Sequence, residues 1–144
     1  MRRLAMDLLA RREYGRVELQ RKLQRRGVQD TALLVRVLDA LEQDGLLDQQ
    51  RFLEMYIRAR VNAGFGPLRI AAELMQKGVP RGEVDVSLQV FSAEWRSAIV
   101  QARNKKFGSS CVSGRDELAR QFRFLAYRGF PSDLIQQILF SSAD

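Results

Sequence analysis

Histidine is absent from the sequence, and cysteine occurs once, as Cys111. Histidine is the most frequent general base in enzymes and the usual partner of a serine or cysteine nucleophile, so we do not expect triad-type hydrolysis. The chain also cannot assemble a zinc site of ordinary ligand count or an internal disulfide, and a reducing cytoplasm fits best as its location. Carboxylate pairs such as Asp44 with Asp48, or Asp116 with Glu117, stand where helix caps and first-turn acids are expected, and we assign them that role instead of acid–base or Mg²⁺ chemistry.

Long apolar segments are also missing. No run approaches the about 18 apolar residues of a membrane span, and the amino-terminal residues lack the continuous apolar core of a signal peptide. The 144 residues are 46% hydrophobic and 28% charged, which is typical of a globular protein that can bury a core. We therefore expect a soluble, unprocessed protein with no membrane partner.

Nucleotide-binding motifs are missing as well. The segment GFGP at residues 64–67 matches neither a Walker A loop nor a dinucleotide fingerprint, and no strand pattern precedes it. We interpret Gly64 and Gly66 as allowing a tight bend and Pro67 as belonging to the first turn of a helix. We expect no cofactor and predict that the protein is not an enzyme.

The sequence does contain clear helical periodicity. Apolar residues recur three and four positions apart, in clusters bounded by glycine, proline or capping residues, and no convincing strand alternation is present. Residues 3–45 predict three short helices: Gly15 breaks the first, Gly27 ends the second, and Asp30 or Thr31 caps a third that runs to Gly45. The pattern predicts an all-α fold.

A glycine repeat indicates that this three-helix plan occurs three times. Gly27, Gly78 and Gly129 stand at the same interval of 51 residues, and each has a cation one position earlier and a leucine four positions earlier. Positions six and ten residues after each glycine are apolar and are i, i+4 neighbours on a helix, so we predict that they are buried. These predicted core residues are Leu33 and Val37, Val84 and Leu88, and Ile135 and Leu139.

The predicted repeats span residues 1–47, 48–91 and 92–144, and the third carries an extra loop at residues 108–114. We expect this loop to be flexible and interpret its cysteine, Cys111, as an incidental exposed thiol. Units of this size are near the lower limit for an independent core, so each leans on the next and the array is elongated and curved. Such an array presents one long face instead of a deep pocket, which favours binding over catalysis.

Positive charge indicates the kind of partner. Lys and Arg number 24 against 17 Asp and Glu, giving a net charge of +7 and a pI near 10.3, so we predict an anionic partner. Four cations share one flank of the helix before Gly27. For three of them, Arg21, Lys22 and Arg25, Glu18 is the only nearby acid, and we favour a binding role. Others lie on the corresponding helices of the second and third repeats and on the helix before Gly64. The candidate binding residues are Arg21, Lys22, Arg25, Arg26, Arg58, Arg60, Arg69, Lys77, Arg120, Arg123 and Arg128.

Two alternatives stand beside this interpretation. Arg26, Lys77 and Arg128 each precede a helix-ending glycine, where a cation offsets the helix dipole and contributes about 0.3–1 kcal/mol. The second alternative is a helix-turn-helix reader of duplex DNA, because each repeat joins two helices through a short glycine-containing turn. The helix after Gly27 is a poor recognition helix, since it is largely apolar and its only cation is Arg36. The cations lie before the turn, which suits contact with phosphates or carboxylates without base reading.

Several motifs resemble one family of bacterial regulators. LLDQQRF at residues 46–52, followed by GFGPLRI at residues 64–70 and a closing KGV, is similar to the central element of RecX-type proteins. RFLAYRGF at residues 123–130 resembles the signature of their third repeat, and ELQRKLQRRG at residues 18–27 resembles their first. The resemblance covers nearly the whole chain.

The resemblance to RecX-type regulators implies tandem three-helix repeats that lie along the groove of a RecA filament on single-stranded DNA. It further implies inhibition of the recombinase, ATPase and coprotease activities of that filament. From it we expect a monomer that contacts RecA, and single-stranded DNA weakly and without sequence specificity. A rod with a positive face suits such a groove, because many shallow contacts can add up without a pocket.

Overall fold

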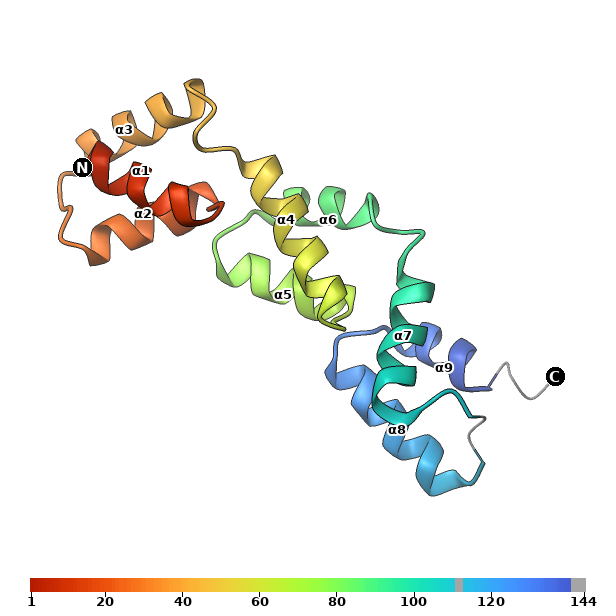
Figure 1. Cartoon of the computed structure of the whole chain (residues 1–144). Coiled ribbons are helices and arrows are strands. Elements are labelled where there is room, and N and C mark those ends of the chain that lie inside the picture. Colours follow the sequence, from red (N-terminus) through yellow and green to blue (C-terminus); the bar gives the residue numbers. More distant parts are fainter. Residues whose placement is uncertain (111–112, 141–144) are drawn as a thin grey trace.

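The computed structural model describes residues 1–110 and 113–140, so Cys111 lies outside the described residues. Within these ranges the chain forms nine α-helices and no strand, which confirms the all-α prediction. Three three-helix units follow one another along an elongated array, with the first and third units at opposite ends (Figure 1). The helices are α1 (Arg2–Arg11), α2 (Arg16–Arg25), α3 (Thr31–Gln43), α4 (Gln49–Asn62), α5 (Pro67–Gln76), α6 (Arg81–Gln89), α7 (Trp95–Phe107), α8 (Arg115–Tyr127) and α9 (Ser132–Phe140).

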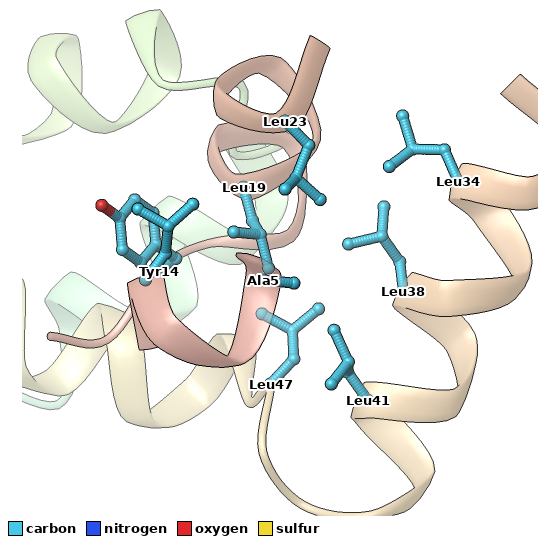
Figure 2. Packing of buried hydrophobic residues seen from close by; sticks show 9 residues of the cluster. Ala5, Tyr14, Leu19, Leu23, Leu34, Leu38, Leu41 and Leu47 are labelled. Carbon is cyan, nitrogen blue, oxygen red and sulfur yellow. The ribbon is translucent and has the colours of Figure 1, made fainter. Parts of the chain in front are cut away.

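Each unit has its own apolar core, formed where the buried faces of its three helices meet. In the first unit, leucines of α2 and α3 close over Ala5 of α1, as Figure 2 shows. The second core is built around Phe52, Ile57 and Ile70. The third core contains Ile99, and Val61 and Trp95 pack against both the second and third cores. The second and third units therefore share apolar contacts. Within the described residues, no helix combines the length and apolar character needed to cross a membrane.

The glycine repeat has the same geometry in all three units. Gly27, Gly78 and Gly129 have φ of +101°, +90° and +100°, a region that favours glycine. In each case the residue after the glycine donates its N–H to the carbonyl five residues earlier, as in a Schellman-type helix end. The leucines four positions before the glycines, Leu23, Leu74 and Leu125, are fully buried. The threefold repeat is thus a structural repeat.

The predicted core position Leu33 is wrong: this side chain is 39% exposed, and Leu34 is buried in its place. The cause is a longer turn in the first unit. Helix α3 begins at Thr31, four residues after Gly27, whereas α6 begins at Arg81, three residues after Gly78. One extra residue rotates the buried face of α3 by about 100° relative to the repeat. Val84 and Ile135 are buried as predicted.

The second and third units are joined backbone to backbone. The Gly66 N–H donates to the Arg128 carbonyl at 2.8 Å, and the Leu68 N–H donates to the Gly129 carbonyl at 3.0 Å. A Cβ on Gly66 would lie 2.6 Å from the Gly129 carbonyl carbon. Gly66 has an ordinary φ of −99°, so the interpretation of this glycine as part of the bend is wrong, and close approach is its role. Gly64 does make the bend with φ +93°, and Pro67 is the first residue of α5, as predicted.

The first and second units meet at the equivalent place, but through side chains. A Cβ on Gly78 would lie 2.4 Å from Cγ1 of Val17, so α2 begins against the end of α5. Arg21 donates from Nη1 to the Gln76 carbonyl at 2.9 Å. We call the contact between the first and second units the first junction, and the contact between the second and third units the second junction. At each junction, the second helix of one unit starts where the second helix of the next unit ends.

Candidate binding surface

Four cations of the first unit form an exposed group, which we call the α2 cations: Arg21, Lys22, Arg25 and Arg26. Three of them are exposed and Lys22 is half-buried. In the described part of the chain none of the four side chains pairs with a carboxylate. Arg21 alone forms a side-chain hydrogen bond within the described ranges, to the Gln76 carbonyl. Arg26 is the C-cap of α2, which is consistent with the helix-dipole alternative for that residue. The structure brings these four predicted residues together on one helix.

Glu18, the only acid near the α2 cations in the sequence, forms its ion pairs with residues outside that group. Its side chain is 10% exposed and is turned to the first junction, where Lys77 donates from Nζ to Oε2 at 2.7 Å. Arg12 donates to both carboxylate oxygens, at 3.0 and 3.1 Å. The positive charge of α2 is therefore less neutralised than the sequence indicates, and Lys77 is a junction residue. Its ion pair with Glu18 gives Lys77 a structural partner.

Lowered pKa values mark the ion pairs of both junctions. Burial would raise the pKa of Glu18, but hydrogen bonds from Arg12 and Lys77 outweigh it, and the pKa lies below its usual value. The same balance, with Arg60 and Tyr56 as the main donors, lowers the pKa of Glu73.

Acid should weaken the fold partly through Glu18. Because its folded-state pKa is below the unfolded value near 4.5, its contribution is complete above that pH and is lost as the pH falls through the folded-state pKa. We expect Glu18→Gln to lower the free energy of unfolding by about 1–3 kcal/mol at neutral pH. Urea titrations should show that the wild-type protein loses more stability on acidification than the variant. Parallel pH profiles of the two proteins would contradict the role of this pair.

At the second junction three arginines surround one aromatic ring. The guanidinium carbons of Arg60, Arg69 and Arg128 lie 3.8, 4.5 and 4.7 Å from the ring centroid of Phe65. We call these three residues the junction arginines. Aromatic faces attract guanidinium groups, so one ring holds cations from both units.

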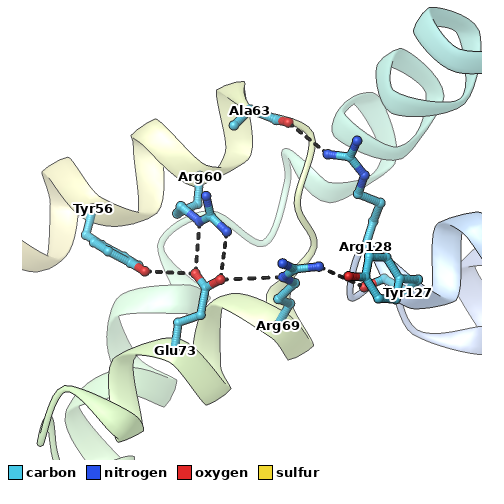
Figure 3. A network of polar contacts seen from close by, with 7 residues as sticks. All are labelled: Tyr56, Arg60, Ala63, Arg69, Glu73, Tyr127 and Arg128. Atoms are coloured by element: carbon cyan, nitrogen blue, oxygen red, sulfur yellow. Dashed lines mark hydrogen bonds and ion pairs between the residues drawn. The ribbon is translucent and has the colours of Figure 1, made fainter.

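Glu73 neutralises part of this cluster, as Figure 3 shows. Arg60 donates from Nε to Oε1 at 2.9 Å and from Nη2 to Oε2 at 2.7 Å, and Arg69 reaches Oε2 at 3.5 Å. The Tyr56 hydroxyl also donates to Glu73, at 2.8 Å, and burial together with this bond raises the pKa of Tyr56 to about 12. Arg128 has no carboxylate partner within the described ranges and donates to the Ala63 carbonyl at 3.2 Å. Two of the three junction arginines, Arg60 and Arg69, thus share one carboxylate, and Arg128 has none among the described residues.

The remaining predicted residues are dispersed. Arg58, on the same helix as Arg60, forms a two-point ion pair with Glu94 at the start of α7. Arg120 pairs with Glu117 at 3.3 Å. Arg123 is exposed on α8 and has no carboxylate partner among the described residues.

Two cations that sequence reasoning missed belong beside the junction arginines. Lys105 and Lys106 are exposed in the last turn of α7 and pair with no carboxylate in the described part of the chain. The adjacent lysines in NKKF were the available signal, but they lie outside the glycine repeat that guided the selection. Among the described residues, no cluster of acidic or cysteine side chains could hold a metal ion.

The fold and its cations define a class: a helical repeat protein of three tandem three-helix units with a positively charged surface and apolar cores. Family models give this class a name. The model described as "RecX, second three-helix domain" matches residues 48–88, and "RecX, third three-helix domain" matches residues 94–139.

Relatives agree over nearly the full chain. Regulatory protein RecX of Pseudomonas putida (strain W619) is 49% identical over 139 residues, which cover 96% of this chain and 88% of that one. The corresponding protein of Pseudomonas entomophila (strain L48) is 48% identical, with coverages of 96% and 89%. The crystal structure of RecX from Lactobacillus salivarius matches the fold with a TM-score of 0.79 at 19% identity, over 97% of this chain and 92% of that one. The chain belongs to the RecX family of regulatory proteins, which is not a family of enzymes.

Proposed function

We propose that this protein binds the RecA filament on single-stranded DNA, lies in its groove as a monomer, and inhibits recombination, ATP hydrolysis and coprotease activity. Membership of the RecX family is the observation that carries this proposal. The protein acts in the cytoplasm, where the filament forms, and consumes no substrate of its own. Inhibition follows from occupancy, because a rod in the groove restricts the assembly and movement of the subunits around it.

The distribution of charge supports a groove contact. The α2 cations are at one end of the array and Arg123 and Arg128 are in the third unit, so unpaired positive charge occurs in both terminal units. Contacts separated in this way reach more than one filament subunit. Weak contacts made by one rigid body add to a larger total affinity, since later contacts form within an existing complex.

Titration of RecA's DNA-dependent ATPase is the direct test. With RecA assembled on circular single-stranded DNA, we expect ATP hydrolysis to slow when the added protein is well below the RecA concentration. A sequence-specific duplex reader would leave the ATPase unchanged and shift one duplex in a gel over random competitor. Helix α3 exposes Leu33 and Val35 beside Arg36, which does not favour base reading. No effect on the ATPase at excess protein would refute the proposal.

A further inference from the structure

A small basic pocket lies beside the second junction, apart from the α2 cations. It has a volume of about 230 Å³ and is bounded by the ends of α4, α7 and α8. Lys105 and Lys106 come from α7, and Arg128 from the end of α8. Small residues and one aromatic ring complete the wall: Ala63, Gly64, Ala102 and Phe124.

No acidic residue lines this basic pocket. Neither lysine pairs with a carboxylate in the described ranges, and neither does Arg128. The C-terminal ends of α7 and α8 each favour nearby cations, but that effect is local to each helix and does not account for the meeting of the cations of both helices in one pocket. Three cations therefore share one concave site with no anion of the protein's own.

Aromatic rings hold the arginine in place. The Arg128 guanidinium carbon lies 4.7 Å from the ring centroid of Phe65 and 5.0 Å from that of Phe124, and Nη1 is fixed on the Ala63 carbonyl. The Lys106 Nζ lies 5.8 Å from the Phe124 centroid. These contacts reduce the side-chain freedom that a ligand would otherwise have to restrict.

The equivalent cation at the first junction, Lys77, has a carboxylate partner that Arg128 lacks among the described residues. One repeat interval of 51 residues relates Lys77 to Arg128 and Glu18 to Arg69. The first junction thus places a carboxylate against Lys77, at 2.7 Å, whereas the second places a guanidinium at the position equivalent to Glu18. The cation before the helix-ending glycine thus has a carboxylate partner at the first junction, Glu18, whereas its equivalent at the second junction, Arg128, has none in the described ranges. An anion from outside would supply the missing charge.

We propose that the basic pocket binds a phosphate group. A phosphate spreads its charge over more oxygens than a carboxylate, which has two, and can therefore meet three cations that approach from separate directions. Lysine binds phosphate as a compact point charge, and two of the three cations are lysines. In a protein that acts on a DNA-bound filament, a premise that rests on the function proposed above, a strand of DNA supplies this phosphate. Free phosphate and mononucleotides have the same chemistry.

Binding of a fluorescein-labelled oligothymidylate, measured by anisotropy without RecA, tests this site directly. Lys105→Gln combined with Lys106→Gln should weaken binding severalfold and reduce the slope of log K against log salt by about 0.7, because the pocket takes one phosphate and each phosphate contact contributes about 0.7 on a single strand. Arg36→Gln combined with Arg81→Gln removes the same charge from exposed sites on α3 and α6 and should change the slope much less. If the two double variants change the affinity and the salt slope equally, the proposal that this pocket binds phosphate is wrong.

Competitors at matched ionic strength identify the source of the phosphate. Displacement of the oligonucleotide by millimolar phosphate or thymidine monophosphate would support a site for free phosphate. Failure of both to compete, with the lysine dependence retained, would support a DNA strand. A polyglutamate peptide that binds more tightly than the oligonucleotide through Lys105 and Lys106 would overturn the proposal in favour of a protein carboxylate. Since no arm contains RecA, the result is independent of filament inhibition.

Discussion

Gly129→Ala should destabilise the protein by about 2–5 kcal/mol. An alanine at φ +100° costs about 1–2 kcal/mol, and the new Cβ would lie 2.4 Å from the Arg69 Cβ and 2.6 Å from its backbone nitrogen, which adds about 1–3 kcal/mol of overpacking. To relieve the clash between the new Cβ and Arg69, the second and third units must separate, which would break the hydrogen bonds donated by Gly66 and Leu68. Urea denaturation followed by circular dichroism measures the loss.

Gly27→Ala is the matched control. Gly27 has the same turn, with φ +101°, but nothing lies within 4 Å of its added Cβ. We expect a loss of about 1–2 kcal/mol there, from backbone strain alone. Hydrogen exchange should become faster at the amides of Gly66 and Leu68 in Gly129→Ala and remain unchanged in Gly27→Ala. Equal destabilisation by the two substitutions would contradict the close approach at the second junction.

Reversing the charge of three of the α2 cations should abolish most of the inhibition of RecA. We expect the combined change of Arg21, Lys22 and Arg25 to glutamate to raise the half-inhibitory concentration about ten- to a hundredfold, because exposed ion pairs contribute about 0.2–1 kcal/mol each and reversal replaces attraction by repulsion. The wild-type inhibition should weaken as salt is added, and the residual inhibition of the variant should depend less on salt. ATPase titration at two salt concentrations provides both values.

Two further variants separate contact from folding. Lys22→Glu with Arg25→Glu leaves Arg21 on the Gln76 carbonyl, so the first junction keeps its hydrogen bond. The second variant is a control that combines Arg36→Glu, Arg81→Glu and Arg96→Glu on α3, α6 and α7. It makes the same change in net charge as the triple variant of α2. Inhibition by this control should remain close to that of the wild type, and helix content should be unchanged in all variants. If the control loses as much inhibition as the α2 variant, net charge alone decides and the proposed surface is wrong.

Local regularities made most of the fold predictable. A helix-ending glycine and a buried leucine four positions earlier depend on a few neighbouring residues, so Gly27, Gly78 and Gly129 gave the repeat directly. The prediction that Leu33 is buried is wrong because one extra residue in the turn before α3 shifts the register of that helix. A repeat interval carries no information about such an insertion. The boundaries between residues 47 and 48 and between residues 91 and 92 stay predictions.

Charges were harder to place than helices, because their partners are distant in sequence. Glu18 meets Lys77 across 59 positions, a separation at which the sequence pattern indicates no partner. Gly66 looked like part of a bend because its contact, Gly129, belongs to another unit. Lys105 and Lys106 acquire significance only through Arg128, which the fold brings to the same pocket. The sequence identifies cations, but the junctions decide which of them are neutralised.

Co-sedimentation with preassembled filaments tests the central claim, that the cationic array docks on a polymer of RecA. The protein should pellet with RecA assembled on single-stranded DNA in a non-hydrolysable nucleotide, and should bind unassembled RecA or DNA alone far more weakly at the same salt concentration. The α2 charge-reversal variant should remain in the supernatant. Equal recovery of the protein with and without RecA filaments would contradict the account.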